Sequence, residues 1–171
     1  MRKETIVREL YQFDELSDTA KEKARDRYRE SGLDYEWWEC TYEDAKTIGL
    51  KIESFDDYNV EADFMASAEE TAHKIEKEHG TACETRIDAE NYLKKRDTLI
   101  DTFPKDENGD FEDQYGLDIK LDALDLSFLR TLREDYRIML KKEYEYLNSD
   151  ESVDENILAN EYEFTIDGKR A

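Results

Sequence analysis

Proline, cysteine and glycine are scarce in this sequence. One proline, two cysteines and six glycines occur among its 171 residues, which excludes collagen-like repeats, proline-rich extended chains and a disulfide framework. Cys40 and Cys83 form no C-x-x-C pair. We therefore expect two reduced cysteines that are mostly buried as small apolar side chains.

Long apolar runs and familiar catalytic motifs are also lacking. No stretch approaches the roughly 18 apolar residues of a membrane span, and the first residues lack the apolar run of a signal peptide. The patterns G-x-x-x-x-G-K-[ST], G-x-S-x-G and H-E-x-x-H do not occur. These absences favour a cytoplasmic protein that is not an enzyme and carries no cofactor.

Positive charge is in short supply. Lysine and arginine number 25 against 46 aspartates and glutamates, so the formal net charge is −21. Phosphate contacts require a basic face, so direct binding to DNA or RNA is disfavoured and a basic protein is the natural partner. Duplex DNA carries one charge per about 1.7 Å, so this net charge equals that of roughly 36 Å of duplex. We interpret the acidity as nucleic-acid mimicry, with solubility alone as the alternative.

Apolar periodicity and helix-capping signals predict ten elements in one domain over residues 1–171. They are, in chain order, a strand at 4–13, helices at 18–30 and 35–48, strands at 50–55 and 60–65, helices at 67–79, 81–102, 124–147 and 152–160, and a strand at 162–166. This order predicts an α+β fold. We expect a small, mainly antiparallel sheet of about four strands, covered by several helices, with one long helix in the C-terminal half.

The carboxylates are concentrated in three segments. Residues 53–70 and 150–167 each hold seven acidic residues and no lysine or arginine, and residues 101–118 hold seven with one lysine. Turns and loops fall in or beside two of these segments. The carboxylates predicted to contact a partner are Asp56, Asp57, Glu61, Asp63, Asp106, Glu107, Asp110, Glu112, Asp113, Asp150 and Glu151.

Two adjacent tryptophans are the most distinctive aromatic feature. Trp37 and Trp38 fall on neighbouring faces of a predicted helix, so one ring can enter the core while the other stays near the surface. We predict that Trp37, beside Glu36 and Glu39, is an interface anchor. Core packing of both rings is the alternative.

The basic residues form stripes on two predicted helices. Lys21, Arg25 and Arg29 follow one another at intervals of four residues, and a second stripe consists of Arg130, Arg133, Arg137 and Lys141. Acidic residues interleave with both stripes, so we expect intramolecular ion pairs. A nucleic-acid-binding face is the alternative.

Two patterns resemble metal sites without matching them. His73 and His79 each follow a glutamate by three residues, but both lie on one predicted helix, where six residues rotate them apart. The loop from Asp106 has the composition of an EF-hand loop, yet Phe111 and Leu117 occupy the places of its glycine and glutamate. We expect no metal, with a weak divalent site in this loop as the alternative.

The amino-acid sequences of four segments resemble those of a family of small acidic phage and prophage proteins. The segments are YQFDELSDTAKEKA at 11–24, YEWW at 35–38, DAKTIGLKI at 44–52 and NEYEFTIDG at 160–168. The similarity covers nearly the whole chain. Members of this family carry antitoxin-like labels, and we expect anti-CRISPR inhibitors among them. The resemblance implies a protein of the bacterial host cytoplasm that blocks a host defence nuclease, and it transfers no functional residue.

Three functions therefore remain in competition. The first is a phage-derived inhibitor that occupies the basic nucleic-acid channel of a defence nuclease, as a monomer or small homo-oligomer. The alternative is an antitoxin-like or phage accessory protein that binds a host protein through an aromatic and hydrophobic surface. The third is an enzyme based on carboxylates or a metal.

Overall fold

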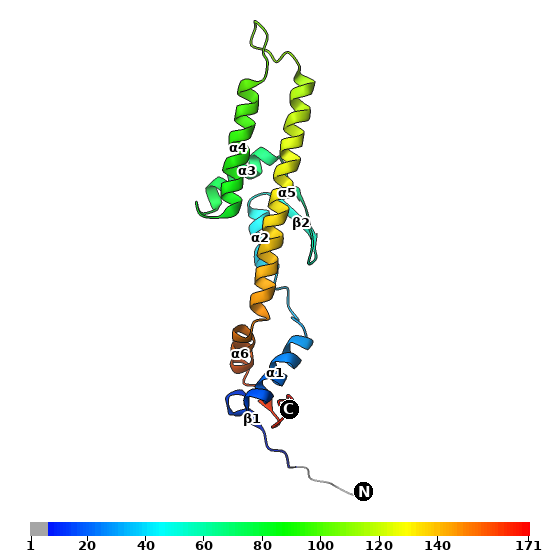
Figure 1. The fold of residues 1–171 in the computed structure, drawn as a ribbon, viewed down its shortest axis with the longest axis vertical. Helices are drawn as coiled ribbons and strands as arrows, with labels where there is room; N and C mark the ends of the chain where they lie inside the picture. Colours follow the sequence, from blue (N-terminus) through cyan, green and yellow to red (C-terminus); the bar gives the residue numbers. More distant parts are fainter. Residues whose placement is uncertain (1–6) are drawn as a thin grey trace. The chain divides into compact units, whose positions relative to one another are not determined.

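The computed structural model describes residues 7–171 (Figure 1). Within this range it contains six α-helices, one short 3-10 helix and four strands, arranged as two compact units. Unit 1 comprises Met1–Trp37, described from Val7 onward, and Lys142–Ala171. Unit 2 comprises Trp38–Lys141. The expectation of one domain over the whole chain stays a prediction.

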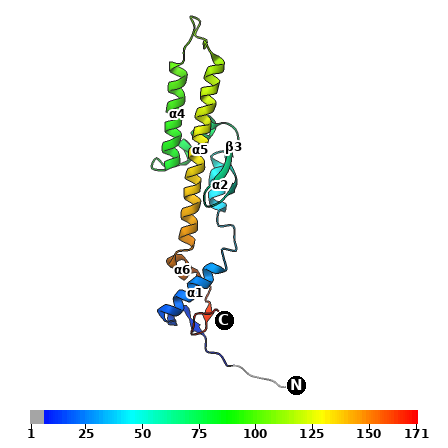
Figure 2. The same ribbon diagram turned by 45° about the vertical axis from the view of Figure 1, so that its right-hand side comes forward.

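Unit 1 brings together the two ends of the described chain. Its elements are β1 (Tyr11–Gln12), η1 (Phe13–Glu15), α1 (Asp18–Glu30), α6 (Asp150–Ala159) and β4 (Glu163–Phe164). β1 pairs with β4 in antiparallel register, Tyr11 opposite Phe164 and Gln12 opposite Glu163. Figure 2 shows α6 and α1 next to this short ribbon. The predicted strand at 4–13 is thus confirmed only at 11–12, and its residues 4–6 lie outside the described range.

The first helix starts where its capping residue predicts. Ser17 Oγ accepts a hydrogen bond from the amide of Ala20 at 3.3 Å, which satisfies one of the free amides at the start of α1. The helices α1 and α6, the 3-10 helix η1 and the β1–β4 ribbon together bury one apolar cluster. Its members are Phe13, Leu16, Ala20, Ala24, Val153, Ile157 and Phe164.

A two-pronged ion pair joins α1 to α6. Arg25 Nε lies 2.7 Å from Asp154 Oδ1 and Arg25 Nη2 lies 2.6 Å from Oδ2. Both side chains are largely shielded from solvent, at 18% and 27% exposure. Such a fork-shaped contact is stronger than an exposed ion pair.

We expect Arg25→Gln and Asp154→Asn each to lower the free energy of unfolding by about 1 to 2 kcal/mol. A double-mutant cycle from urea unfolding should give a coupling energy of similar size, because each variant breaks the same contact. The control is the exposed pair Lys46–Glu43, at 63% and 64% exposure, for which a coupling below about 0.5 kcal/mol is expected. Equal coupling in the two cycles would contradict the prediction.

Unit 2 contains a β-hairpin and four helical segments. Its elements are α2 (Glu39–Thr47), β2 (Leu50–Phe55), β3 (Val60–Phe64), α3 (Ala68–Glu78), α4 (Glu84–Thr102) and α5 (Gln114–Leu147), the last six residues of α5 belonging to unit 1. β2 and β3 pair in antiparallel fashion with a bulge between Ile52 and Ser54. Figure 1 shows α4 and α5 running side by side up to the loop that joins them.

The core of unit 2 follows the two periodicities of the sequence. Alternate residues of the hairpin are buried, including Leu50 and Val60, while their neighbours face solvent. On α5 the buried residues Phe128, Leu132, Tyr136 and Leu140 recur every four positions, and Leu129 is buried beside them. The ring of Phe128 stacks on Tyr92 of α4 with centroids 4.4 Å apart. The prediction that this helix is the longest is confirmed by its 34 residues.

The α+β class is confirmed, but the expectation of about four strands in one sheet is wrong. The structure has two sheets of two strands each, β1 with β4 and β2 with β3. The hairpin closes through a four-residue turn within unit 2, whereas β1 and β4 pair in unit 1 across nearly the full length of the sequence. Strand periodicity indicates how many strands exist, but not which strands share a ladder.

Four predicted helix starts are wrong, and one of them is that of the long helix, since α5 begins at Gln114 and not at 124. α6 starts at Asp150, since Ser149 Oγ accepts from the amide of Ser152 at 3.3 Å, and Ser152 lies buried inside the helix. α4 starts at Glu84 behind Cys83, not at Thr81. A turn in which the amide of Trp37 donates to the carbonyl of Tyr35 delays α2 until Glu39. Capping patterns in sequence do not rank competing starts.

The expected burial of the cysteines is also wrong. Cys40 and Cys83 are both exposed. Cys83 is the N-cap residue of α4, and Cys40 lies in the first turn of α2, whose buried residue is Ala45. Among residues 7–171, no helix has both the length and the apolar character needed to cross a bilayer.

Candidate partner-binding surfaces

The turn of the β2–β3 hairpin presents Asp56 and Asp57 at the surface. Asp56 Oδ1 accepts from the amides of Tyr58 and Asn59 at 2.8 and 2.9 Å, which is an Asx turn. One carboxylate of the pair therefore shapes the turn. Asp57 is exposed and its backbone carbonyl accepts from Arg137 Nη1 at 3.4 Å.

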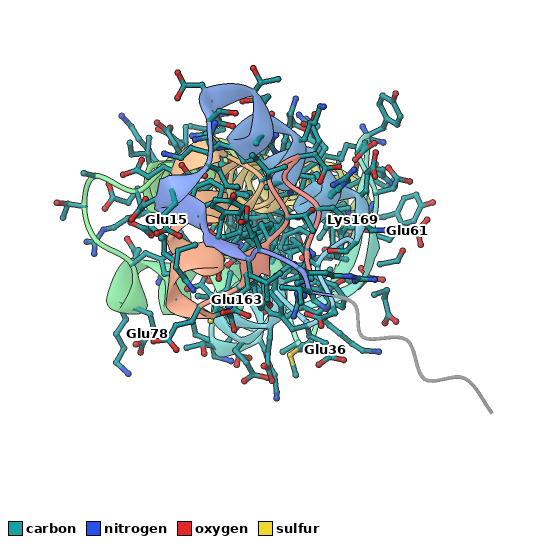
Figure 3. All side chains as sticks on the ribbon, turned by 90° about the horizontal axis from the view of Figure 1, so that it is seen from below. Glu15, Glu36, Glu61, Glu78, Glu163 and Lys169 are labelled. Carbon is teal, nitrogen blue, oxygen red and sulfur yellow. The ribbon has the colours of Figure 1, made fainter. Side chains whose placement is uncertain are left out.

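The outward face of the hairpin carries Glu61 and Asp63. They are exposed because they alternate with the buried Val60 and Ala62 along β3. Figure 3 shows Glu61 at the rim of the ribbon. On β2, Lys51 lies opposite Asp63 but is paired with Glu53 at 2.5 Å. The sequence-predicted hairpin carboxylates thus lie on one exposed element, as an acidic strip that we call the hairpin strip (Asp56, Asp57, Glu61 and Asp63).

The loop between α4 and α5 carries five further predicted carboxylates, all exposed. We call this set the loop tip, and its members are Asp106, Glu107, Asp110, Glu112 and Asp113. Asp106 Oδ1 accepts from the amides of Asn108 and Asp110 at 2.8 and 3.0 Å, and these backbone bonds lower the pKa of Asp106. Asp113 Oδ1 accepts from the amide of Gly116 at 2.9 Å and so caps α5 ten residues before the predicted start of the long helix.

Aromatic side chains pack together next to the loop tip. The rings of Phe103 and Phe111 meet edge to face with centroids 6.0 Å apart. Lys105 Nζ lies 5.1 Å from the centre of the Phe111 ring, and Lys120 Nζ lies 5.1 Å from that of Phe103. No group of three or more potential metal ligands occurs in residues 7–171.

The hairpin strip and the loop tip are separated along α5. The hairpin turn contacts α5 at Arg137, and the loop ends where α5 begins at Gln114. A rise of about 1.5 Å per residue makes this separation about 35 Å. Figures 1 and 2 both show the α4–α5 loop at the far end of the helix pair from the hairpin. Unit 2 therefore presents two acidic sites about one turn of duplex DNA apart.

The predicted acidic residues of unit 1 are placed differently. Asp150 forms ion pairs with Arg29 and, at 3.9 Å, with Arg25, so much of its charge is compensated within the unit. Glu151, the next residue of α6, is exposed. The predicted intramolecular pairing of the basic stripe on α1 is confirmed for Arg25 and Arg29.

Trp37 is partly buried in unit 1. The centroid of its ring lies 5.5 Å from that of the Tyr144 ring, and the two ring planes form an angle of 47°. Trp38, in unit 2, lies 5.8 Å from the ring of Phe55. Each ring thus has an aromatic neighbour within its own unit, and the role of Trp37 as an interface anchor stays a prediction.

A partly buried polar network in unit 2 was not predicted from the sequence. Tyr136 Oη donates to Asp44 Oδ2 at 2.7 Å, His79 Nε2 lies 3.4 Å from Asp44 Oδ1, and His79 Nδ1 lies 2.7 Å from Thr85 Oγ1. His79 and then Tyr136 lower the pKa of Asp44, while burial and the Asp44 carboxylate raise that of Tyr136. The sequence contained one indication of this network, which is Tyr136 at a core position of the long helix, because a buried tyrosine hydroxyl requires a hydrogen-bond partner.

This chain of hydroxyl, imidazole and carboxylate has the order of a catalytic triad. Thr85, which would be the nucleophile, is only 5% exposed, and the side chain of His79 is 10% exposed. A substrate carbonyl cannot reach a hydroxyl that is covered in this way. The network joins α2, α4 and α5 to the end of α3, and we assign it a structural role.

A second, partly buried acidic group, Asp135, lies next to this network on α5. Burial, followed by the negative charge of Asp88 on α4, raises the pKa of Asp135 to about 7; the charges of Glu84 and Glu134 add to the shift. Asp135 Oδ2 is buried and has no hydrogen-bond partner among residues 7–171. A largely desolvated carboxyl group close to other carboxylates favours its protonated form.

No protein-family model, curated protein or solved structure matches this chain.

Proposed function

We propose that the chain inhibits a nucleic-acid-binding enzyme by occupying its basic channel in place of DNA. The observation that supports this proposal is the pair of exposed acidic sites on unit 2, the hairpin strip and the loop tip, about 35 Å apart along α5. A channel that holds one turn of duplex contacts phosphates over a similar distance. The two sites therefore resemble the ends of such a footprint in charge and spacing.

The resemblance to small acidic phage and prophage proteins directs the proposal to a class of target. The target would be a defence nuclease in the cytoplasm of the bacterial host, with the RNA-guided nucleases as first candidates. The net charge of −21 favours rapid, salt-sensitive association with a basic surface. In this proposal the chain acts as a binding protein and performs no catalysis.

The test reverses charge at the loop tip without disturbing its fold. Glu107, Asp110 and Glu112 are exposed, whereas Asp106 and Asp113 bond backbone amides and are left unchanged. We expect the triple lysine variant to bind a purified RNA-guided nuclease at least about 100-fold more weakly than the natural chain, because like charges then face each other. Duplex DNA should compete with the natural chain, and binding should weaken as salt increases.

A control with the same net charge separates site from bulk acidity. The variant Glu30→Lys, Glu36→Lys and Glu155→Lys changes three exposed carboxylates elsewhere and gives the same net charge of −15, since −21 + 6 = −15. It should bind within about threefold of the natural chain. Equal loss in both variants would reject a directed surface, and salt-independent binding unaffected by either would favour the aromatic-surface alternative.

A further inference from the structure

Unit 2 contains a hollow rich in positive charge beside the hairpin turn. Its volume is about 150 Å³, room for several water molecules or one phosphate group. We call it the basic hollow, and its lining includes Tyr58, Asn59, Arg130, Arg133, Glu134 and Arg137. Three arginines thus converge on one site in a chain whose acidic residues far outnumber its basic ones.

The arginine nearest the hairpin turn is balanced by a carboxylate. Arg137 Nε and Nη2 donate to the two carboxylate oxygens of Glu134 at 2.8 and 2.6 Å, and its Nη1 donates to the carbonyl of Asp57. The nearby Asp56 carboxylate is turned toward the backbone amides of its own turn. Arg137 and Glu134 therefore form a fixed, nearly neutral wall of the hollow.

The positive charges of the other two arginines are not balanced by an ion pair. Arg133 donates from Nε and Nη2 to the carbonyl oxygen of Ala62, which is a neutral acceptor. This contact fixes the guanidinium, and Nη1 forms no hydrogen bond within residues 7–171. Arg130 is exposed, and no carboxylate in residues 7–171 forms an ion pair with either Arg130 or Arg133. The lining thus carries three positive charges against one negative charge.

Asp56 and Asp57 lie in the same turn as Tyr58 and reduce this local excess. Carboxylates more than about 10 Å away are largely screened at 0.1 M salt, whereas contacts within the hollow are not. Guanidinium groups match the geometry of phosphate oxygens and bind them through paired N–H donors. The basic hollow is therefore suited to a phosphate group.

An exposed aromatic ring stands at the rim of the hollow. Tyr58 is 89% exposed although it is a large aromatic residue, so packing within the chain does not explain its presence. The Asx turn holds the backbone of Tyr58 and so fixes the position from which its side chain extends. Exposed rings beside basic groups stack on nucleobases.

We propose that the basic hollow binds a nucleoside monophosphate, with its phosphate on Arg130 and Arg133 and its base stacked on Tyr58. The volume of the hollow suits one phosphate group. This proposal goes beyond the inhibitory function: the arginines of the hollow are not part of the hairpin strip or the loop tip, although Tyr58 lies next to Asp57 of the hairpin strip.

The test is isothermal titration of the full chain with AMP, inorganic phosphate and adenosine at about 0.1 M salt. AMP should bind about tenfold more tightly than inorganic phosphate, because only AMP adds a stacking contact. Arg130→Gln should weaken both by about five- to tenfold. Tyr58→Ala should weaken AMP about tenfold and leave inorganic phosphate unchanged.

The matched control is Arg27→Gln, which removes an exposed arginine of α1 in unit 1 and should leave both affinities unchanged. Arg130, Tyr58 and Arg27 are all exposed, so their variants should fold. Equal weakening by Arg27→Gln and Arg130→Gln would overturn the site. Absence of binding heat with AMP, together with unchanged amide NMR signals of residues 58–60 and 130–137, would overturn it as well. AMP affinity that survives Tyr58→Ala would overturn the nucleotide as ligand.

Discussion

Gly168→Ala is expected to destabilise unit 1 severely, by about 3 kcal/mol or more. Gly168 has a φ of +77°, and a Cβ added there would lie 2.1 Å from the carbonyl oxygen of Ala20. Ala20 is buried in α1, so this carbonyl cannot move without shifting the helix against the core. Strain and collision therefore act together at one position.

Gly32→Ala is the matched control for Gly168→Ala. Gly32 has a similar φ of +72°, but a Cβ there would meet nothing within 4 Å. We expect a loss of only about 1 kcal/mol, due to the backbone conformation alone. Urea unfolding followed by the amide NMR signals of β1 and β4 measures both variants. Equal losses would show that backbone conformation, and not the approach to Ala20, makes Gly168 necessary.

Asp135→Asn is expected to stabilise the protein at alkaline pH. The folded-state pKa of Asp135, about 7, is above the ordinary value of 3.8, so between these values the folded state holds a proton that the unfolded state has released. The free energy of unfolding contributed by this group therefore falls as pH rises from about 4 to 7 and stays low above 7. Asparagine removes the charge and with it this loss.

The gain from Asp135→Asn should be near zero below pH 4, increase with pH and level off above pH 7 at about 1 to 2 kcal/mol, after allowance for partial solvent exposure. Asp122→Asn, at an exposed position of the same helix, should change stability by less than about 0.5 kcal/mol at every pH. Thermal and urea unfolding at pH 4, 5.5, 7 and 8.5 provide the comparison. A gain that does not depend on pH would contradict the raised pKa of Asp135.

Asp44 has the opposite dependence on pH. Its pKa is lowered by His79 and Tyr136, so its stabilising contribution is present above the ordinary carboxyl pKa and is lost as pH falls through the lowered folded-state value. The contribution of Asp44 to the free energy of unfolding therefore changes at a lower pH than the contribution of Asp135. The two effects are therefore separable in a single pH series.

Local signals in the sequence were reliable where one interaction decides an element. Ser17 predicts the start of α1 because its hydroxyl reaches the nearest free amide, and Gly49 predicts the end of α2 because its φ of +86° suits glycine. The hairpin follows from the alternation of polar and apolar residues on either side of the turn from Asp56 to Asn59. These signals involve residues that are neighbours in the chain.

Predictions failed where distant residues compete or pair. Ser149 and Ser152 are both capable of capping α6, and the burial of Ser152 in the core selects Ser149. Asp135 reads as one more surface carboxylate, and only the approach of α4 places Asp88 against it. The contact of Trp37 with Tyr144, more than a hundred residues away in sequence, is likewise not readable from chain order, and the role of Trp37 as an interface anchor stays a prediction.

The sequence by itself determined the α+β class, the long helix, the hairpin and the concentration of carboxylates in three segments, because composition and periodicity act over a few residues. Only the tertiary structure decided how those charges are used. It placed the hairpin strip and the loop tip about 35 Å apart along α5, paired Asp150 with arginines and left Arg130 and Arg133 around a hollow. The reason is physical: a charge is neutralised, shared or exposed according to its neighbours in space, and chain order alone does not specify them.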